Sequence, residues 1–95
     1  MEFEWDQDEA ETNLRKHRID FADAIDIFKD MGASHVLDET MDYGEDRFRA
    51  VGIVRSVVLV VVYVERGERV RIISARKATK REEQDHLEER WAGQD

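Results

Sequence analysis

The side chains of this chain that could carry chemistry are a group of cations and a few histidines. Cutting an RNA phosphodiester without a metal needs a group that takes the 2′-hydroxyl proton, a group that protonates the leaving oxygen, and cations that hold the charge on phosphorus. Arginine suits the last task because its planar fork matches phosphate oxygens. The residues that could supply these parts are Lys16, His17, Arg47, Arg71, Arg76, Lys77 and His86.

The histidines His17, His35 and His86 lie far apart in the sequence, and there is no cysteine. Because a zinc site needs clustered ligands, we expect no metal and no other cofactor. His17 falls on the apolar face of a predicted helix, which leaves a structural and a catalytic role equally open. His86 on a polar helix fits an ordinary solvated residue as well as a proton donor, and we assign His35 to structure.

The charge of the chain is unevenly distributed. Its net charge of −8 argues against a simple nucleic-acid binder, because an acidic surface repels a polyanion. Between residues 66 and 81, however, seven basic side chains stand against Glu68 alone, a local charge of +6. This patch predicts weak and salt-dependent binding of a short anionic segment. Its members are Arg66, Arg69, Arg71, Arg76, Lys77, Lys80 and Arg81.

Arg76 and Lys77 are the best phosphate-binding pair, because they stand between a predicted strand and a predicted helix. Arg71 and Arg76 differ in parity, so an undistorted strand would direct them to opposite faces, and only a bend near the strand end would bring both to one site. Lys16 either serves function or only offsets the negative end of a helix. The phosphate-binding candidates beside Arg76 are Arg71, Lys77, Lys80 and Arg81.

The N-terminal part of the chain predicts one strand and two helices. From residue 2 to residue 6, the aromatic residues Phe3 and Trp5 alternate with acidic residues, as in a short strand. Residues 8–17 predict a helix with Leu14 on its apolar face. Residues 20–28 predict a second helix, with Asp20 as its N-cap.

Four strands and a last helix are expected in the rest of the chain. The strands are predicted at residues 34–38, 47–54, 57–65 and 69–76, with a loop at 39–45. The third is almost wholly β-branched and should be central, with both faces buried. Thr79 and Glu82 fit a capping box that opens the helix, with Leu87 and Trp91 as its docking anchors.

This order, β-α-α-β-β-β-β-α, predicts an α+β fold in one domain, residues 1–95. Consecutive strands should form a small antiparallel meander, with the helices packed against one face. The longest apolar run has eight residues, too few to cross a bilayer. The lack of cysteine and of a basic start fits a cytoplasmic protein.

Several motifs resemble those of the BrnT toxins and occur in the same order. The segment from Arg71 to Thr79, Arg-Ile-Ile-Ser-Ala-Arg-Lys-Ala-Thr, continuing to Glu82, is the longest and most specific. The resemblance covers roughly residues 3–86. The other matching features are Phe3-Glu4-Trp5-Asp6, Asn13, Lys16-His17, Phe21-x-x-Ala24 to Phe28, Glu45-x-Arg47 and Gly52.

The resemblance implies a fold related to RelE-like toxins and a metal-independent ribonuclease that arrests translation. It also implies a BrnA-type antitoxin partner that holds the toxin inactive in a hetero-oligomer and alone contacts the operator DNA. Where the family often has a tyrosine in the last helix this chain has His86, which could replace it in proton transfer. The implied functional positions are Lys16, His17, Glu45, Arg47 and Arg76.

Two other functions remain open at this stage. The first is a catalytically inactive toxin-like module that binds an antitoxin or another regulatory protein, which an acidic surface would favour by steering a basic partner. The second is a stand-alone RNA-binding domain. A cleavage assay separates the enzyme from the inactive module. A neighbouring antitoxin gene would favour either of these two over a stand-alone RNA-binding domain.

Overall fold

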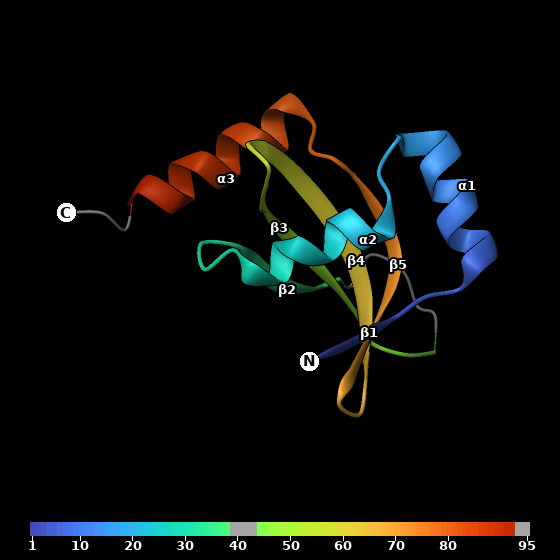
Figure 1. Cartoon of the computed structure of the whole chain (residues 1–95). Coiled ribbons are helices and arrows are strands. Elements are labelled where there is room, and N and C mark those ends of the chain that lie inside the picture. Colours follow the sequence, from blue (N-terminus) through green and yellow to red (C-terminus); the bar gives the residue numbers. More distant parts are fainter. Residues whose placement is uncertain (39–43, 93–95) are drawn as a thin grey trace.

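The computed structural model describes residues 1–38 and 44–92 (Figure 1). The elements follow as β1 (Glu2–Glu4), α1 (Gln7–His17), α2 (Phe21–Ala24), the 3-10 helix η1 (Ile25–Lys29), β2 (Ser34–Asp38), β3 (Arg47–Val54), β4 (Val57–Arg66), β5 (Arg69–Lys77) and α3 (Lys80–Ala92). The loop predicted at 39–45 falls mostly on residues 39–43, which lie outside the described residues. Among the described residues, no helix is both long enough and apolar enough to cross a membrane.

The strands form one mixed five-stranded sheet in the order β1-β5-β4-β3-β2. From β2 to β5 neighbouring strands are antiparallel, as the predicted meander requires. β1 pairs in parallel with β5, so the α+β class is confirmed but the purely antiparallel sheet is wrong. The parallel pairing is possible because α1, α2 and η1 lead the chain from β1, at one edge of the sheet, to β2, at the other edge. β1 therefore occupies the free edge of β5.

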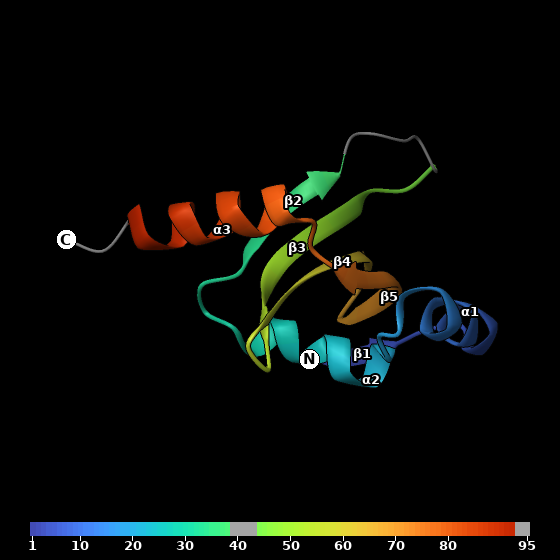
Figure 2. The same cartoon turned by 90° about the horizontal axis from the view of Figure 1, so that it is seen from above.

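Helices lie on both sides of the sheet (Figure 2). This suits the central strand β4, which is apolar on both faces. Leu59, Val61 and Tyr63 pack with α2 and η1 in the main core. The alternate residues Val58 and Val60 are also buried, on the face toward α3. The predicted packing of all helices against one face is therefore wrong. We call the two sides the α2 face and the α3 face.

The second helix is shorter than predicted and continues as η1 after Ala24. Gly52 of β3 explains how closely η1 approaches the sheet. A Cβ at Gly52 would lie 2.8 Å from Ile27 Cγ1 and 3.0 Å from Asp30 Oδ2. The absence of a side chain therefore allows Ile27, which is fully buried, to lie directly against the strand.

Asp30, just after η1, joins three parts of the fold. Its carboxylate accepts hydrogen bonds from the backbone N–H of Ile53 at 2.7 Å and of Gly32 at 3.0 Å. Arg90 of α3 donates to it at 2.6 and 3.0 Å. The Arg90 guanidinium and these backbone donors hold the pKa of Asp30 well below its usual range. This single carboxylate therefore ties the turn before β2 to β3 and to α3.

The face that α3 turns to the sheet is not the predicted one. Trp91 is 62% exposed, so its prediction as a docking anchor is wrong, and Leu87 is only partly buried. His86 is buried instead, although a solvated position was the expected alternative. The ion pair between Arg90 and Asp30 accounts for the orientation of the helix. His86 lies four residues before Arg90, so both occupy the side of α3 that faces the sheet.

An irregularity in β5 determines which side chains share a face of the sheet. Val62 of β4 pairs with Ser74, but the next residue, Tyr63, pairs with Ile72. Since β4 is in regular register with β3, the extra residue, Ile73, belongs to β5 and forms a β-bulge.

The bulge reverses the alternation along β5. Arg71 lies opposite Val64 and Arg76 lies opposite Val60, two positions of equal parity on a regular strand. Both arginines therefore lie on the α3 face, brought together by a bulge within the strand and not by the bend near its end that the sequence left open. Ala75 remains in the main core for the same reason.

Asn13 of α1 holds the edge of β5 where β1 no longer pairs with it. Its side-chain amide donates to the carbonyl of Ala75 at 2.9 Å, and the amide N–H of Ala75 donates back to Asn13 Oδ1 at 3.1 Å. The same amide also donates to the Ile19 carbonyl at 3.1 Å. Asn13 is buried, whereas Leu14 is 42% exposed, so the predicted place of Leu14 on the apolar face is wrong, although Ala10 of the same helix packs against the core.

Replacing Asn13 by Ala should lower the free energy of unfolding by about 2–3 kcal/mol, because the buried N–H and C=O of Ala75 lose their partners. Urea unfolding followed by circular dichroism measures the loss. Leu14→Ala is the matched control, and its exposed position predicts a much smaller effect. Equal losses in the two variants would contradict this role of Asn13.

Candidate functional site

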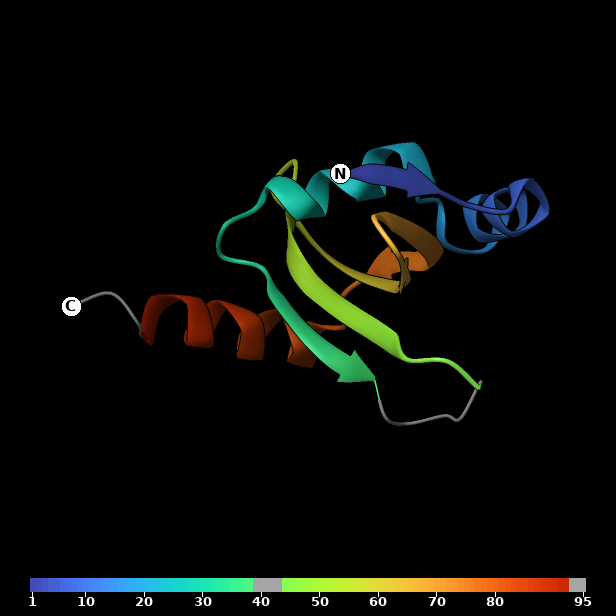
Figure 3. The same ribbon diagram turned by 90° about the horizontal axis from the view of Figure 1, so that it is seen from below.

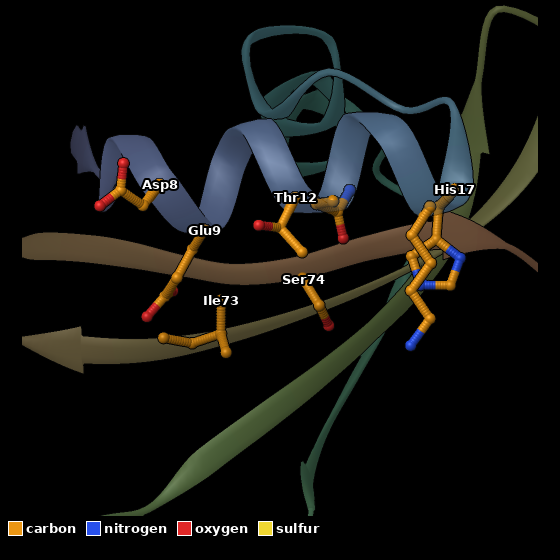
Figure 4. A pocket seen from close by; sticks show the side chains of 8 residues that line it. Asp8, Glu9, Thr12, His17, Ile73 and Ser74 are labelled. Atoms are coloured by element: carbon orange, nitrogen blue, oxygen red, sulfur yellow. The ribbon is translucent and has the colours of Figure 1, made fainter.

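A cavity of about 370 Å³ lies between α1 and β5, and we call it the α1–β5 cavity. Figure 4 shows that the acids of the first turn of α1 line one end and His17 lies at the other, with Ser74 below the helix. Its lining residues are Asp8, Glu9, Thr12, Asn13, Lys16 and His17 from the helix and Ile73 and Ser74 from the strand.

Two contacts of α1 bring Lys16 and His17 to this cavity. Asn13, fixed to the backbone of Ala75, lies three and four residues before them, so all three occupy one side of the helix. Arg18 then ends the helix in a left-handed conformation with φ of 62°, and its N–H donates to the carbonyl of Leu14. The helix C-terminus is favourable for cations, which suits the positions of Lys16 and His17.

Arg76 lies on the same strand as the cavity wall. Ser74 and Arg76 pair with Val62 and Val60, so both lie on the α3 face, two residues or about 6.6 Å apart along the strand. The guanidinium of Arg76 forms a bidentate ion pair with Glu82, at 2.7 Å and 2.9 Å. The structure therefore aligns an acid–base cavity and a fixed arginine along one edge of the sheet.

The Arg76–Glu82 pair is electrostatically strong. Hydrogen bonding from Arg76, supported by the backbone N–H of Thr79, lowers the pKa of Glu82 to about 2. The same contact raises the pKa of Arg76. The predicted capping box is confirmed, since Thr79 N–H donates to Glu82 at 2.8 Å and Glu82 N–H donates to Thr79 Oγ1 at 3.1 Å.

Two more arginines lie on the α3 face across the sheet. Arg49 of β3 lies in register with Val62, which in turn pairs with Ser74. Arg47 begins β3 and pairs in register with Asp38. Arg49 also lines a second hollow, of about 320 Å³, between β2, β3 and α3. This hollow also contains Glu82, Asp85, His86 and Glu89 of α3.

Four predicted site residues lie elsewhere. Lys77 follows Arg76 and faces the other side of the sheet, near Arg18 and Asp20. Glu45 pairs with Arg66 at 3.3 Å. The remaining two are in α3: Lys80 is exposed at its start, and His86 is buried, with Nε2 3.4 Å from Arg90 Nη1.

The cationic patch predicted from the sequence is largely paired with carboxylates from outside it. Arg71 binds Glu4 at 3.2 Å and Arg69 binds Glu2 at 3.3 Å, because β1 lies beside β5. The remaining pairs are Arg66–Glu45, Arg76–Glu82 and Arg81–Asp85. The local charge of +6, counted from the sequence, therefore overestimates the positive electrostatic potential at this surface.

Three residues of the site were not proposed as functional from the sequence. Ser74 was hidden by the assumption of a regular strand, although it lies within the most specific matching motif. Asn13 had a signal, as a polar residue within an amphipathic helix. Glu82 was assigned only to the helix cap. None of these sequence features indicates which distant residue the side chain contacts in the fold.

In residues 1–38 and 44–92, no three or more His, Asp or Glu side chains are grouped so that they could hold a metal ion. The polar groups that line the α1–β5 cavity are an amine, an imidazole, an amide, two hydroxyls and two carboxylates.

The fold and the site define a small α+β protein that carries a lysine, a histidine and an arginine along one sheet edge, side-chain types that phosphodiester cleavage can use. The family model described as "Ribonuclease toxin, BrnT, of type II toxin-antitoxin system" matches residues 5–82, and the chain belongs to this family. The chain matches none of the curated proteins.

Replacing Glu82 by Gln should lower the free energy of unfolding by about 2 kcal/mol at pH 7 and by almost nothing at pH 2. In the unfolded chain Glu82 has the ordinary pKa of 4.5, and in the folded chain it stays ionised down to about pH 2. Its contribution is therefore complete above pH 4.5 and is lost as the pH falls toward 2.

Urea unfolding between pH 2 and pH 7 measures this difference. Glu88→Gln is the matched control, because it removes an exposed acid from the same helix. A stability gap between wild type and Glu82→Gln that does not change with pH would contradict the assignment.

Proposed function

We propose that this chain is the endoribonuclease toxin of a type II toxin–antitoxin pair. The observation that carries the proposal is the alignment produced by the bulge in β5. The bulge turns Ser74 and Arg76 together to the α3 face, and Ser74 lines the α1–β5 cavity with Lys16 and His17. Family membership supports ribonuclease chemistry in general, and this alignment supports a particular location for it.

The proposed reaction is an internal transesterification. The 2′-oxygen of one nucleotide bonds to phosphorus while the bond from phosphorus to the 5′-oxygen of the next nucleotide breaks, leaving a 2′,3′-cyclic phosphate and a 5′-hydroxyl. Of Lys16 and His17, one accepts the 2′-hydroxyl proton and the other protonates the 5′-oxygen. Arg76 donates to the non-bridging oxygens, which carry the charge of the transition state. No step requires a metal.

The other cations have supporting roles in this proposal. Arg71 and Arg47 lie on the α3 face and could bind the phosphates that flank the cut, while Lys80 and Arg81 extend the contact to the start of α3. Lys77 faces the other side of the sheet. It takes no chemical step in the proposal, and neither do Glu45 and the buried His86.

The biological part of the proposal follows the family. We propose that RNA cleavage arrests translation in the cytoplasm and that a BrnA-like antitoxin neutralises the toxin in a hetero-oligomer. Operator DNA would be contacted through the antitoxin alone. The sheet flanked by helices supports a relation to RelE-like toxins.

A second candidate function is a catalytically inactive toxin-like module that still binds an antitoxin or another regulatory protein. The ion pairs of the cationic patch favour it, because five of its arginines already hold carboxylates. A tight complex with the antitoxin without any RNA cleavage would support this function over the first.

The purified chain, freed of antitoxin, should cut RNA and should do so equally in the presence of EDTA. Gel analysis of RNA ends, with detection of a 2′,3′-cyclic phosphate, measures the activity. Co-expression of the adjacent antitoxin gene should restore growth to cells that express the toxin. Intact RNA after incubation with a folded, antitoxin-free chain would refute the proposal.

Replacing Arg76 by Ala should reduce the cleavage rate by about 10²–10³-fold, because one donor to the developing charge is lost. Single-turnover cleavage of a fluorescent RNA measures this rate, and circular dichroism verifies the fold. Lys29→Ala is the matched control, since it removes one positive charge from the opposite layer of the molecule. Unchanged cleavage by the Arg76 variant would remove this residue from the site.

A further inference from the structure

The carboxylate of Glu82 is held by two different parts of the chain at once. Its Oε1 accepts from the backbone N–H of Thr79 at 2.8 Å and from Arg76 Nη1 at 2.7 Å. Its Oε2 accepts from Arg76 Nη2 at 2.9 Å. The backbone N–H of Thr79 fixes the carboxylate, and the carboxylate accepts hydrogen bonds from both terminal nitrogens of Arg76. The plane of the guanidinium is therefore fixed as well.

The donors of Arg76 can be counted. A guanidinium carries five N–H donors. Glu82 takes one from each terminal nitrogen, and the carbonyl of Lys77 takes the second donor of Nη1, at 3.3 Å. Among the described residues nothing else accepts from this side chain, so the Nε–H and one Nη2–H are left. These two are neighbours and form the side edge of the guanidinium, which can bind an anion through two parallel hydrogen bonds.

We propose that Glu82 is a positioning residue, which holds Arg76 so that this Nε/Nη2 edge is presented to an RNA phosphate. The inference rests on the proposed function and names a residue that the proposed reaction does not use directly. The side chain of Arg76 is 36% exposed, so a ligand can reach it while the ion pair remains intact. Glu82 itself, occupied by Thr79 and Arg76, touches no substrate.

The pair also sets how strongly RNA is held before it is cut. With Glu82 ionised, Arg76 and Glu82 together carry no net charge, and the ground-state attraction for a polyanion is small. The fixed donors act when charge builds up on the phosphate oxygens, since their orientation needs no rearrangement at that moment. Removing the negative charge should therefore strengthen RNA binding and weaken catalysis, two changes of opposite direction.

The variants Glu82→Gln, Glu82→Asp and Thr79→Ala test this role. Glu82→Gln should bind an uncleavable 2′-deoxy-substituted RNA about 3-fold more tightly, in fluorescence anisotropy, and cut the normal RNA about 10²-fold more slowly at saturation. Glu82→Asp retains the charge but shortens the reach, so it should lose rate without gaining affinity. Thr79→Ala removes the hydroxyl of the same helix cap and leaves the carboxylate, so it should lose stability but less than 3-fold in rate.

Equal loss of rate in Glu82→Gln and Thr79→Ala would overturn the proposal, because both would then act only through the helix cap. Unchanged kcat in Glu82→Gln would overturn it too. A second measurement does not depend on cleavage: the Arg76 Nε–H resonance in NMR should shift when the deoxy-substituted RNA binds wild type and shift less in Glu82→Gln. If wild type cuts no RNA, the proposed function fails, and this resonance still decides whether Glu82 orients Arg76 toward phosphate.

Discussion

The constraint on which the rest of the molecule depends is the bulge in β5, together with the amide of Asn13 that holds the strand edge beyond it. If Ile72 stayed in the core and β5 were regular, strict alternation would place Arg76 in the core and Ala75 on the opposite face. With it, the apolar residues on both sides of the bulge share the α2 face and the arginines share the α3 face. The bulge thus lets β5 bury its apolar residues on the α2 face and place its arginines on the α3 face.

Features that depend on neighbours in the sequence were predictable, and features that depend on distant partners were not. The extent of β3, predicted at residues 47–54, and the Thr79–Glu82 cap are local, and the structure has both as expected. The bulge depends on pairing across strands, and the parallel β1 depends on which sheet edge is free. For the same reason the cations of β5 could be read from the sequence, whereas the carboxylates that pair with them could not.

The ion pairs around the site give the chain a different character from a strongly basic nucleic-acid binder. All five arginines of the patch are held by acids, so in the proposed function specific geometry rather than net charge selects the phosphate that is cut. This agrees with an acidic protein that belongs to a ribonuclease toxin family. An enzyme of this kind would bind bulk RNA weakly and would depend on a correctly oriented substrate.

The helix α3 lies on the opposite side of the sheet from α2 (Figure 3). The helix is polar around most of its circumference and is held near each end by an ion pair, Arg76–Glu82 and Arg90–Asp30. It should therefore be the first cooperative unit to detach, ahead of the sheet. Its amides should exchange with solvent faster than those of β4, and salt should speed that exchange because screening weakens the exposed part of its attachment.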